Sequence, residues 1–135
     1  MGVIRIIYLL ALCLSLISCS NEPFFWDKEC DVSIEIYKSG KEVNELKLTP
    51  ESEIYTTLRQ FINKGKWENT YTTYVPDIIL RSKYFEINLW RDRVIVNYYN
   101  KKNNPIQSIW KPAGQELAAL KKCREHILNI LKQQQ

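Results

Sequence analysis

The residues of this chain that could do chemistry are its thiols and its one imidazole. His126 is the only histidine, and the four cysteines are Cys13, Cys19, Cys30 and Cys123. A thiol can be acylated, oxidised to a disulfide or bound to a metal ion, but zinc sites need closely spaced cysteine and histidine ligands. The cysteines and the histidine do not follow such a spacing, so we predict no metal site and no cofactor. Acylation and disulfide formation are the remaining possibilities.

The first 18 residues have the composition of a secretory leader. Arg5 supplies one positive charge, and the stretch from Ile6 to Leu14 is almost entirely apolar before small residues follow. Such a stretch is too short to cross a bilayer as a stop-transfer helix. We therefore expect residues 1–18 to be a signal peptide and the rest of the chain to be exported.

The end of this leader reads Leu16-Ile17-Ser18-Cys19 and resembles the lipobox of bacterial lipoproteins. The resemblance implies that Cys19 is diacylated and becomes the first mature residue. In that family the next residue influences sorting. Ser20, which is not an aspartate, implies an outer-membrane lipoprotein whose domain faces the periplasm. The alternative is an ordinary signal peptide followed by a fortuitous cysteine.

Two cysteines remain after this assignment, because Cys13 leaves with the leader and Cys19 is lipidated. Cys30 and Cys123 would then lie in a compartment that favours oxidation. A disulfide between them would close a loop of about 90 residues, which the chain-entropy model values at about 4 to 5 kcal/mol. We predict this disulfide, and two free buried thiols are the alternative.

Residues 19–29 are expected to be a lipidated tether, and residues 30–132 a single globular domain. Fully extended, ten tether residues reach only about 35 Å, so the domain stays close to the membrane surface. Three aromatic residues, Phe24, Phe25 and Trp26, are unusual in a linker. We expect them to pack on the domain; the alternative is that they rest in the membrane interface.

The residue pattern gives no indication of catalysis. His126 falls late in a predicted helix, where a histidine is typically a surface residue near the negative helix end. The sequence has no G-x-S-x-G motif and no phosphate-binding glycine loop. Asp77 or Glu86 could serve a glycosidase only if the fold placed a second carboxylate beside it. We therefore expect a protein that is not an enzyme.

The periodicity of residues 30–132 predicts an α+β domain. Period-two alternation predicts strands over 31–37, 43–48, 84–90 and 93–99, and the Thr, Tyr, Val and Ile content of 70–80 predicts another. Residues 106–110 are an optional last short strand, which the order below does not count. Apolar residues at helical spacing predict one helix with Thr49 as N-cap, Pro50 as first residue and Gly65 at its end, and a second helix from about Pro112. We expect the order β-β-α-β-β-β-α, a mainly antiparallel sheet and both helices packed on one face. Because Pro76 interrupts the strand over 70–80, that strand is expected at an edge of the sheet.

The sheet face without helices is the candidate binding surface. Alternation along residues 84–90 and 93–99 directs a mixture of aromatic, arginine, carboxylate and amide side chains to that face. These candidate partner-binding residues are Tyr84, Glu86, Asn88, Trp90, Arg93, Asn97 and Tyr99. Trp, Tyr and Arg often anchor protein interfaces, although aromatic residues are also good strand formers and can simply cover a sheet.

These features favour a binding module of the cell envelope. At the level of class, a small periplasmic lipoprotein with a disulfide and no catalytic pattern resembles the immunity proteins that neutralise antibacterial effectors. The alternatives are an accessory subunit of an envelope secretion or assembly complex, an inhibitor of lysozyme, and a carrier of a lipid or small molecule. The net charge of +4, or +3 once Arg5 is removed, comes without a run of basic residues, so we expect no nucleic-acid partner.

Overall fold

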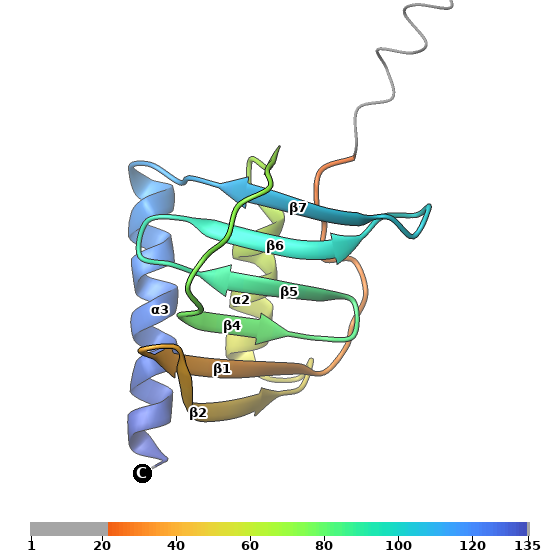
Figure 1. Cartoon of the computed structure of the whole chain (residues 1–135). Helices are drawn as coiled ribbons and strands as arrows, with labels where there is room; N and C mark the ends of the chain where they lie inside the picture. Colours follow the sequence, from red (N-terminus) through yellow and green to blue (C-terminus); the bar gives the residue numbers. More distant parts are fainter. Residues whose placement is uncertain (1–21, 135) are drawn as a thin grey trace, which may run out of the picture.

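The computed structural model describes residues 22–134, which form one antiparallel sheet with two helices on one of its faces (Figure 1). Within these residues the sheet has seven strands in the order β2-β1-β4-β5-β6-β7-β3. The elements are β1 (Val32–Lys38), β2 (Lys41–Leu48), α2 (Glu53–Asn63), β3 (Glu68–Asn69), β4 (Ile78–Arg81), β5 (Phe85–Leu89), β6 (Val94–Tyr99), β7 (Pro105–Trp110) and α3 (Gln115–Gln133). The predicted α+β class and the antiparallel sheet with helices on one face are confirmed.

The core lies between the sheet and the helices, because apolar side chains alternate with polar ones along the strands and point to the helix-covered face. Ile87 of β5 pairs with Val96 of β6, and both side chains are completely buried on the helix-covered face. Leu58 of α2 and Leu120 of α3 are buried against the same face. Complete burial of a side chain of this size contributes roughly 1.5 to 3 kcal/mol, so this layer is the main source of stability.

The N-terminal segment packs on the domain, as expected for two of its three aromatic residues. Phe24 and Trp26 are buried in the core, whereas Phe25 points to solvent. The backbone of Trp26 is held by α2, since Asn63 Oδ1 accepts its N–H at 2.7 Å and Arg59 Nε donates to its carbonyl at 3.0 Å. The folded unit therefore includes residues that the sequence assigned to a tether.

The predicted signal peptide and the proposed lipidation site, Cys19, lie outside the described residues. In the part of the chain that the structure describes, neither helix combines the length and the apolar character that crossing a membrane would need.

The first helix starts later than the sequence predicts. Its N-cap is Ser52, and Glu53 is its first residue. The N–H of Ser52 bonds to the carbonyl of Thr49 at 3.1 Å, so Pro50 and Glu51 form a turn before the helix instead of its first residues. The second helix likewise begins at Gln115, three residues after Pro112.

The prediction of an edge strand over residues 70–80 is wrong. Only Ile78–Arg81 forms a strand, β4, and it lies inside the sheet between β1 and β5. Pro76 precedes β4 and therefore removes no hydrogen bond from the sheet. The short strand β3 was not predicted. It pairs with β7 and forms one edge of the sheet, and β2 forms the other.

Residues 70–77, which we call the strap, cross the sheet between β3 and β4. In the strand order, β5, β6 and β7 all lie between these two strands. Because the helices occupy one face, the strap passes over the other, as the green segment in front of the sheet shows (Figure 1). The face expected to be open is thus partly covered by the chain itself.

The predicted disulfide is not formed, and both Cys30 and Cys123 are free thiols in the structure. Cys30 precedes β1, and its N–H donates to the Tyr55 hydroxyl group at 3.1 Å at the beginning of α2. Cys123 lies in α3 and lines a cavity with Phe61 near the end of α2. The two cysteines thus meet different parts of α2, Cys30 near its beginning and Cys123 near its end.

Candidate functional site

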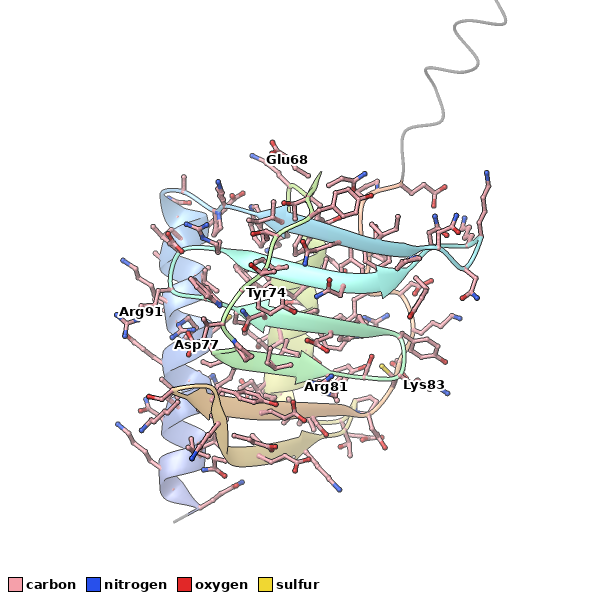
Figure 2. All side chains as sticks on the ribbon, viewed as in Figure 1. Glu68, Tyr74, Asp77, Arg81, Lys83 and Arg91 are labelled. Carbon is pink, nitrogen blue, oxygen red and sulfur yellow. The ribbon has the colours of Figure 1, made fainter. Side chains whose placement is uncertain are left out.

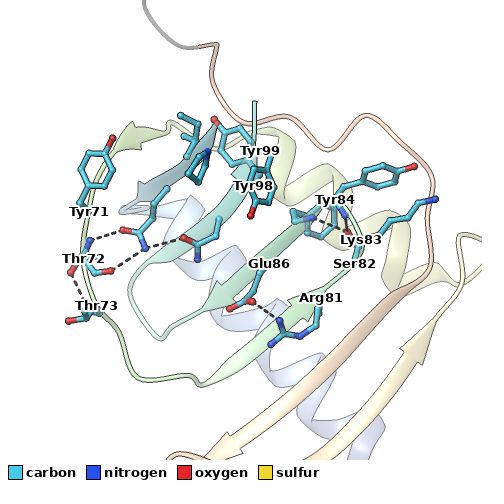
Figure 3. A pocket seen from close by; sticks show the side chains of 15 residues that line it. Tyr71, Thr72, Thr73, Arg81, Ser82, Lys83, Tyr84, Glu86, Tyr98 and Tyr99 are labelled. Carbon is cyan, nitrogen blue, oxygen red and sulfur yellow. Dashed lines mark hydrogen bonds and ion pairs between the residues drawn. The ribbon is translucent and has the colours of Figure 1, made fainter. Parts of the chain in front are cut away.

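A cleft of about 720 Å³ lies on the open face beside the strap (Figure 3). Its wall and floor come from the strap and from four neighbouring strands with their turns. The lining residues are Tyr71, Thr72, Thr73, Arg81, Ser82, Lys83, Tyr84, Phe85, Glu86, Asn97, Tyr98, Tyr99, Pro105, Ile106 and Gln107. The cleft joins residues distant in sequence, which only the completed sheet brings together.

A row of polar residues forms the floor of the cleft because of the strand register. Arg81 of β4 pairs with Glu86 of β5, Glu86 with Asn97 of β6, and Asn97 with Gln107 of β7. Residues paired in this way point to the same face, with their Cβ atoms about 5 Å apart. One polar residue from each of four strands therefore lines up across the sheet.

The strap is hydrogen-bonded to this row at two places. Gln107 Oε1 accepts the N–H of Thr72 at 2.7 Å, and Gln107 Nε2 donates to the carbonyl of Thr72 at 3.1 Å. The Tyr74 hydroxyl group accepts a bond from Asn97 Nδ2 at 2.8 Å and donates to Glu86 Oε1 at 3.1 Å. Tyr74 lies over the central strands (Figure 2), so these contacts fix the strap across the middle of the sheet.

Arg81, at the β4 end of this polar row, links two carboxylates. Its Nη1 lies 2.6 Å from Glu86 Oε2, and its Nε lies 3.1 Å from Glu35 Oε2 on β1. Partial burial lowers the pKa of Arg81, but the hydrogen bond to Glu35 and the two nearby negative charges raise it, and the net shift is upward. Hydrogen bonds therefore continue from Glu35 through Arg81 and Glu86 to the strap.

The Tyr74 phenol is held in its neutral form. Burial, the negative charge of Glu86 and the hydrogen bond to Glu86 raise the pKa of Tyr74 to about 12. A phenol that donates to a carboxylate loses that bond when it ionises, and two negative charges would then meet. Tyr74 is thus a neutral donor over the whole physiological pH range.

Beneath the strap a second row is closed off from solvent. Asn88 of β5 pairs with Ile79 of β4 on one side and with Ile95 of β6 on the other. All three side chains point to the open face, yet all three are buried. Asn88 Oδ1 accepts the N–H of Asp77 at 3.1 Å, and the Nε1–H of Trp90 donates to the carbonyl of Val75 at 2.9 Å. The strap is thus packed on the sheet as well as hydrogen-bonded to it.

The end of the strap is clamped by α3 from the other face. Arg124 Nη1 lies 2.7 Å from Asp77 Oδ2 and also donates to the backbone carbonyl of Leu89. Asp77 is the residue before β4, and Figure 2 places it next to α3. A single guanidinium group therefore connects α3, the strap and the end of β5.

Four of the seven residues predicted to bind a partner line the cleft: Tyr84, Glu86, Asn97 and Tyr99. Asn88 is buried under the strap and cannot touch a partner. Trp90 and Arg93 lie at the other end of β5 and β6, where the strap ends, outside the cleft lining.

Residues from outside the predicted set complete the cleft, above all Tyr71, Arg81 and Gln107. The alternation of the strand over 106–110 could have placed Gln107 on the open face. Tyr71 carried no such signal, because its position depends on the path of the strap.

Exposed tyrosine rings border the cleft. Tyr71 on the strap is 91% exposed, Tyr99 at the end of β6 is 67% exposed, and Tyr84 is 38% exposed. The amino groups of Lys28 and Lys83 lie 4.8 and 5.0 Å from the centre of the Tyr84 ring. The cleft thus offers phenol rings, amide groups and the amino group of Lys83, with Lys28 beside Tyr84 at its border, which suits non-covalent recognition.

No group of three or more metal-ligating side chains occurs among residues 22–134. A smaller cavity of about 410 Å³ lies between the helices, with Phe61, Trp110 and Cys123 among its lining residues. His126 lines the same cavity and is exposed.

Comparison with known proteins adds no relative. No family model matches the chain, and neither a curated protein nor a solved structure shows significant similarity to it.

Proposed function

We propose that this chain is a lipid-anchored protein of the bacterial envelope that binds another protein through the cleft on its open sheet face. Within this role we favour an immunity protein that neutralises an antibacterial effector. The lipobox-like Leu16-Ile17-Ser18-Cys19 supports the anchor and the compartment.

The observation that carries the binding role is the clustering of exposed apolar side chains. The described residues contain six large hydrophobic side chains that are exposed: Phe25, Val43, Tyr71, Val75, Tyr84 and Tyr99. Four of them lie on the strap or at the border of the cleft. Tyrosine is enriched among the residues that dominate binding energy, and clustered apolar groups with polar neighbours are typical of protein interfaces.

The cleft is also preorganised for binding. Tyr74, Asn97 and Gln107 hold the strap by side-chain hydrogen bonds, so Tyr71 is presented on a fixed backbone. A surface that is already ordered loses little conformational entropy when a partner binds. This arrangement favours recognition of a folded partner with a complementary shape.

Anchoring at Cys19 would strengthen such an inhibitor. An inhibitor and an effector that both act at the same membrane meet at a raised effective concentration. The cationic Lys28 and Lys83 beside Tyr84 favour a partner whose contact surface carries acidic groups.

The experiment is affinity capture with the processed full chain, tagged at its C-terminus, from envelope extracts and secreted material of the source bacterium. A second bait carries Tyr71→Ser and Tyr99→Ser. Val43→Ser is the matched control, because Val43 is 52% exposed but lies on β2, outside the cleft lining. We expect a stoichiometric toxin-like enzyme whose activity the wild-type and Val43→Ser proteins inhibit. The double variant should bind it at least about 30-fold more weakly, equivalent to about 2 kcal/mol.

Other outcomes would contradict the proposal in distinct ways. Equal capture by the double variant would show that the cleft is not the binding surface. Recovery of resident envelope proteins instead of an enzyme would indicate an accessory subunit of an envelope complex.

A further inference from the structure

The structure fixes where the chain enters the folded domain. Phe24 is buried, with ring centres 4.9 Å from Tyr98, 5.8 Å from Trp67 and 5.8 Å from Phe85. If Cys19 is acylated, only five residue steps separate the anchor from Phe24, which corresponds to at most about 17 Å. The domain surface around Phe24 must then stay next to the bilayer.

That surface is a corner formed by Glu22–Phe25 and by the turn between β6 and β7. Lys101 in this turn lies 3.3 Å from the carboxylate of Glu22, which places the turn beside the entry point. Asn100 Oδ1 accepts the N–H groups of Lys102 and Asn104 at 3.0 and 2.9 Å, so the turn has a defined shape. Its two lysines are exposed at the corner.

Phe25 has no role in the core. Its two neighbours in this segment, Phe24 and Trp26, point inward, but Phe25 is 59% exposed at the corner. An exposed aromatic side chain three residues after Glu22, whose carboxylate meets Lys101, gives this corner both kinds of group that membrane interfaces accommodate. An aromatic ring enters the headgroup boundary, and amino groups meet lipid phosphates.

We infer that this corner lies against the phospholipid bilayer, with Phe25 at the interface and Lys101 and Lys102 facing anionic headgroups. The inference rests on the proposed acylation of Cys19. Figure 1 shows the C-terminal end of α3 and strand β2 at the far side of the molecule from this corner, so they point away from the membrane. The open sheet face then stands sideways to the bilayer, and one end of the cleft adjoins the contact, because Tyr99 and Pro105 flank the turn.

The test compares nitroxide labels at two positions of the full chain, processed in cells and reconstituted in vesicles of phosphatidylethanolamine and phosphatidylglycerol. Cys30 and Cys123 are changed to Ala, and the label is attached to Phe25→Cys or to Val43→Cys. These positions are matched, since Phe25 and Val43 are 59% and 52% exposed. Collision with oxygen, which partitions into lipid, is measured against collision with a water-soluble nickel complex.

We expect the ratio of oxygen to nickel collisions to be several-fold higher at position 25 than at position 43. Equal ratios in protein whose mass shows acylated Cys19 would overturn the corner contact and leave the anchor intact. A mass without acyl chains would overturn the anchor, and the inference with it. Vesicles without phosphatidylglycerol should lower the ratio at position 25, and an unchanged ratio would overturn the role of Lys101 and Lys102.

Discussion

The Tyr74 hydroxyl group donates a 3.1 Å hydrogen bond to the carboxylate of Glu86, and this contact joins the strap to the centre of the sheet. The same hydroxyl group accepts a bond from Asn97 on the neighbouring strand. Glu86 is bound in turn by Arg81. Tyr74 therefore joins the polar row of the sheet and the strap into one hydrogen-bonded unit.

Changing Tyr74 to Phe should destabilise the protein. The variant keeps the ring but removes two hydrogen bonds and leaves Asn97 Nδ2 without this acceptor, which should lower the free energy of unfolding by about 1 to 2 kcal/mol. Urea unfolding followed by tryptophan fluorescence measures the change. Tyr71→Phe is the control, because Tyr71 is almost fully exposed and its loss of a hydroxyl group should cost less than about 0.5 kcal/mol. Equal effects in the two variants would show that the Tyr74 contacts contribute nothing.

The raised pKa of Tyr74 makes stability depend on pH in the alkaline range. The folded protein holds the phenolic proton with a pKa of about 12, against 10.0 for an ordinary tyrosine. The folded state therefore binds the proton more tightly than the unfolded chain does. The resulting stabilisation is complete below pH 10.0 and is lost as the pH rises toward about 12.

Wild type should accordingly lose more stability than Tyr74→Phe between pH 10.0 and about 12. The other tyrosines and the lysines are common to both proteins, so the difference between the two unfolding curves isolates this group. Absorbance of the phenolate provides a second measurement, in which the folded wild type has one late-titrating phenol that the variant lacks. A difference curve that is flat with pH would contradict the assignment.

The fold could be predicted because its main signals are local. Every second residue of β5 and β6 is apolar. Phe85 and Ile87 therefore point to the same face of the sheet in any order of the strands. The sequence signal failed for residues 70–80. Their Thr, Tyr and Val residues have strand propensity, but whether they join the sheet depends on which strands lie between β3 and β4. That order is a property of the whole chain.

The candidate site was half predictable for the same reason. Alternation placed Glu86 and Asn97 on the correct face, and it also placed Asn88 there, where the strap then buries it. The predicted disulfide failed because helical spacing showed only that Cys123 faces inward. It could not show that Cys30 would lie beside Tyr55 at the beginning of α2 and Cys123 beside Phe61 near its end.

Arg124 should contribute to the stability of the strap from the opposite face of the sheet. Changing Arg124 to Met keeps much of the side-chain volume but removes the contacts to Asp77 and to the carbonyl of Leu89. We expect a loss of about 1 to 3 kcal/mol, because a hydrogen-bonded, mostly buried charge pair is broken. Lys121→Met is the control on an exposed face of the same helix. Hydrogen exchange at the Asp77 amide should accelerate in Arg124→Met only, and an unchanged rate would argue against the clamp.

Gly65 is required by its close approach to an aromatic ring. A Cβ atom at this position would lie 2.6 Å from Nε1 of Trp67, whose ring packs on Trp110 and Phe24. Gly65→Ala should therefore displace the indole ring and destabilise the protein by about 1 to 3 kcal/mol. At Gly40 a Cβ atom would meet nothing, but φ is +76°, so Gly40→Ala should cost only the backbone strain of about 1 kcal/mol. Near-ultraviolet circular dichroism should change in Gly65→Ala and not in Gly40→Ala. An identical spectrum in both would contradict the ring contact.

The two cysteines should behave as independent thiols of unequal reactivity. Both are free, so denaturation without a reductant should allow a maleimide to label Cys30 and Cys123 completely, as read by mass spectrometry. In the native protein Cys30 should react first, because it is only partly buried, whereas Cys123 is buried and burial raises the pKa of its thiol. Cys30→Ser supplies the control, since its remaining thiol should show only the slow phase. Protection of both thiols in the denatured, unreduced protein would mean that the chain is cross-linked after all.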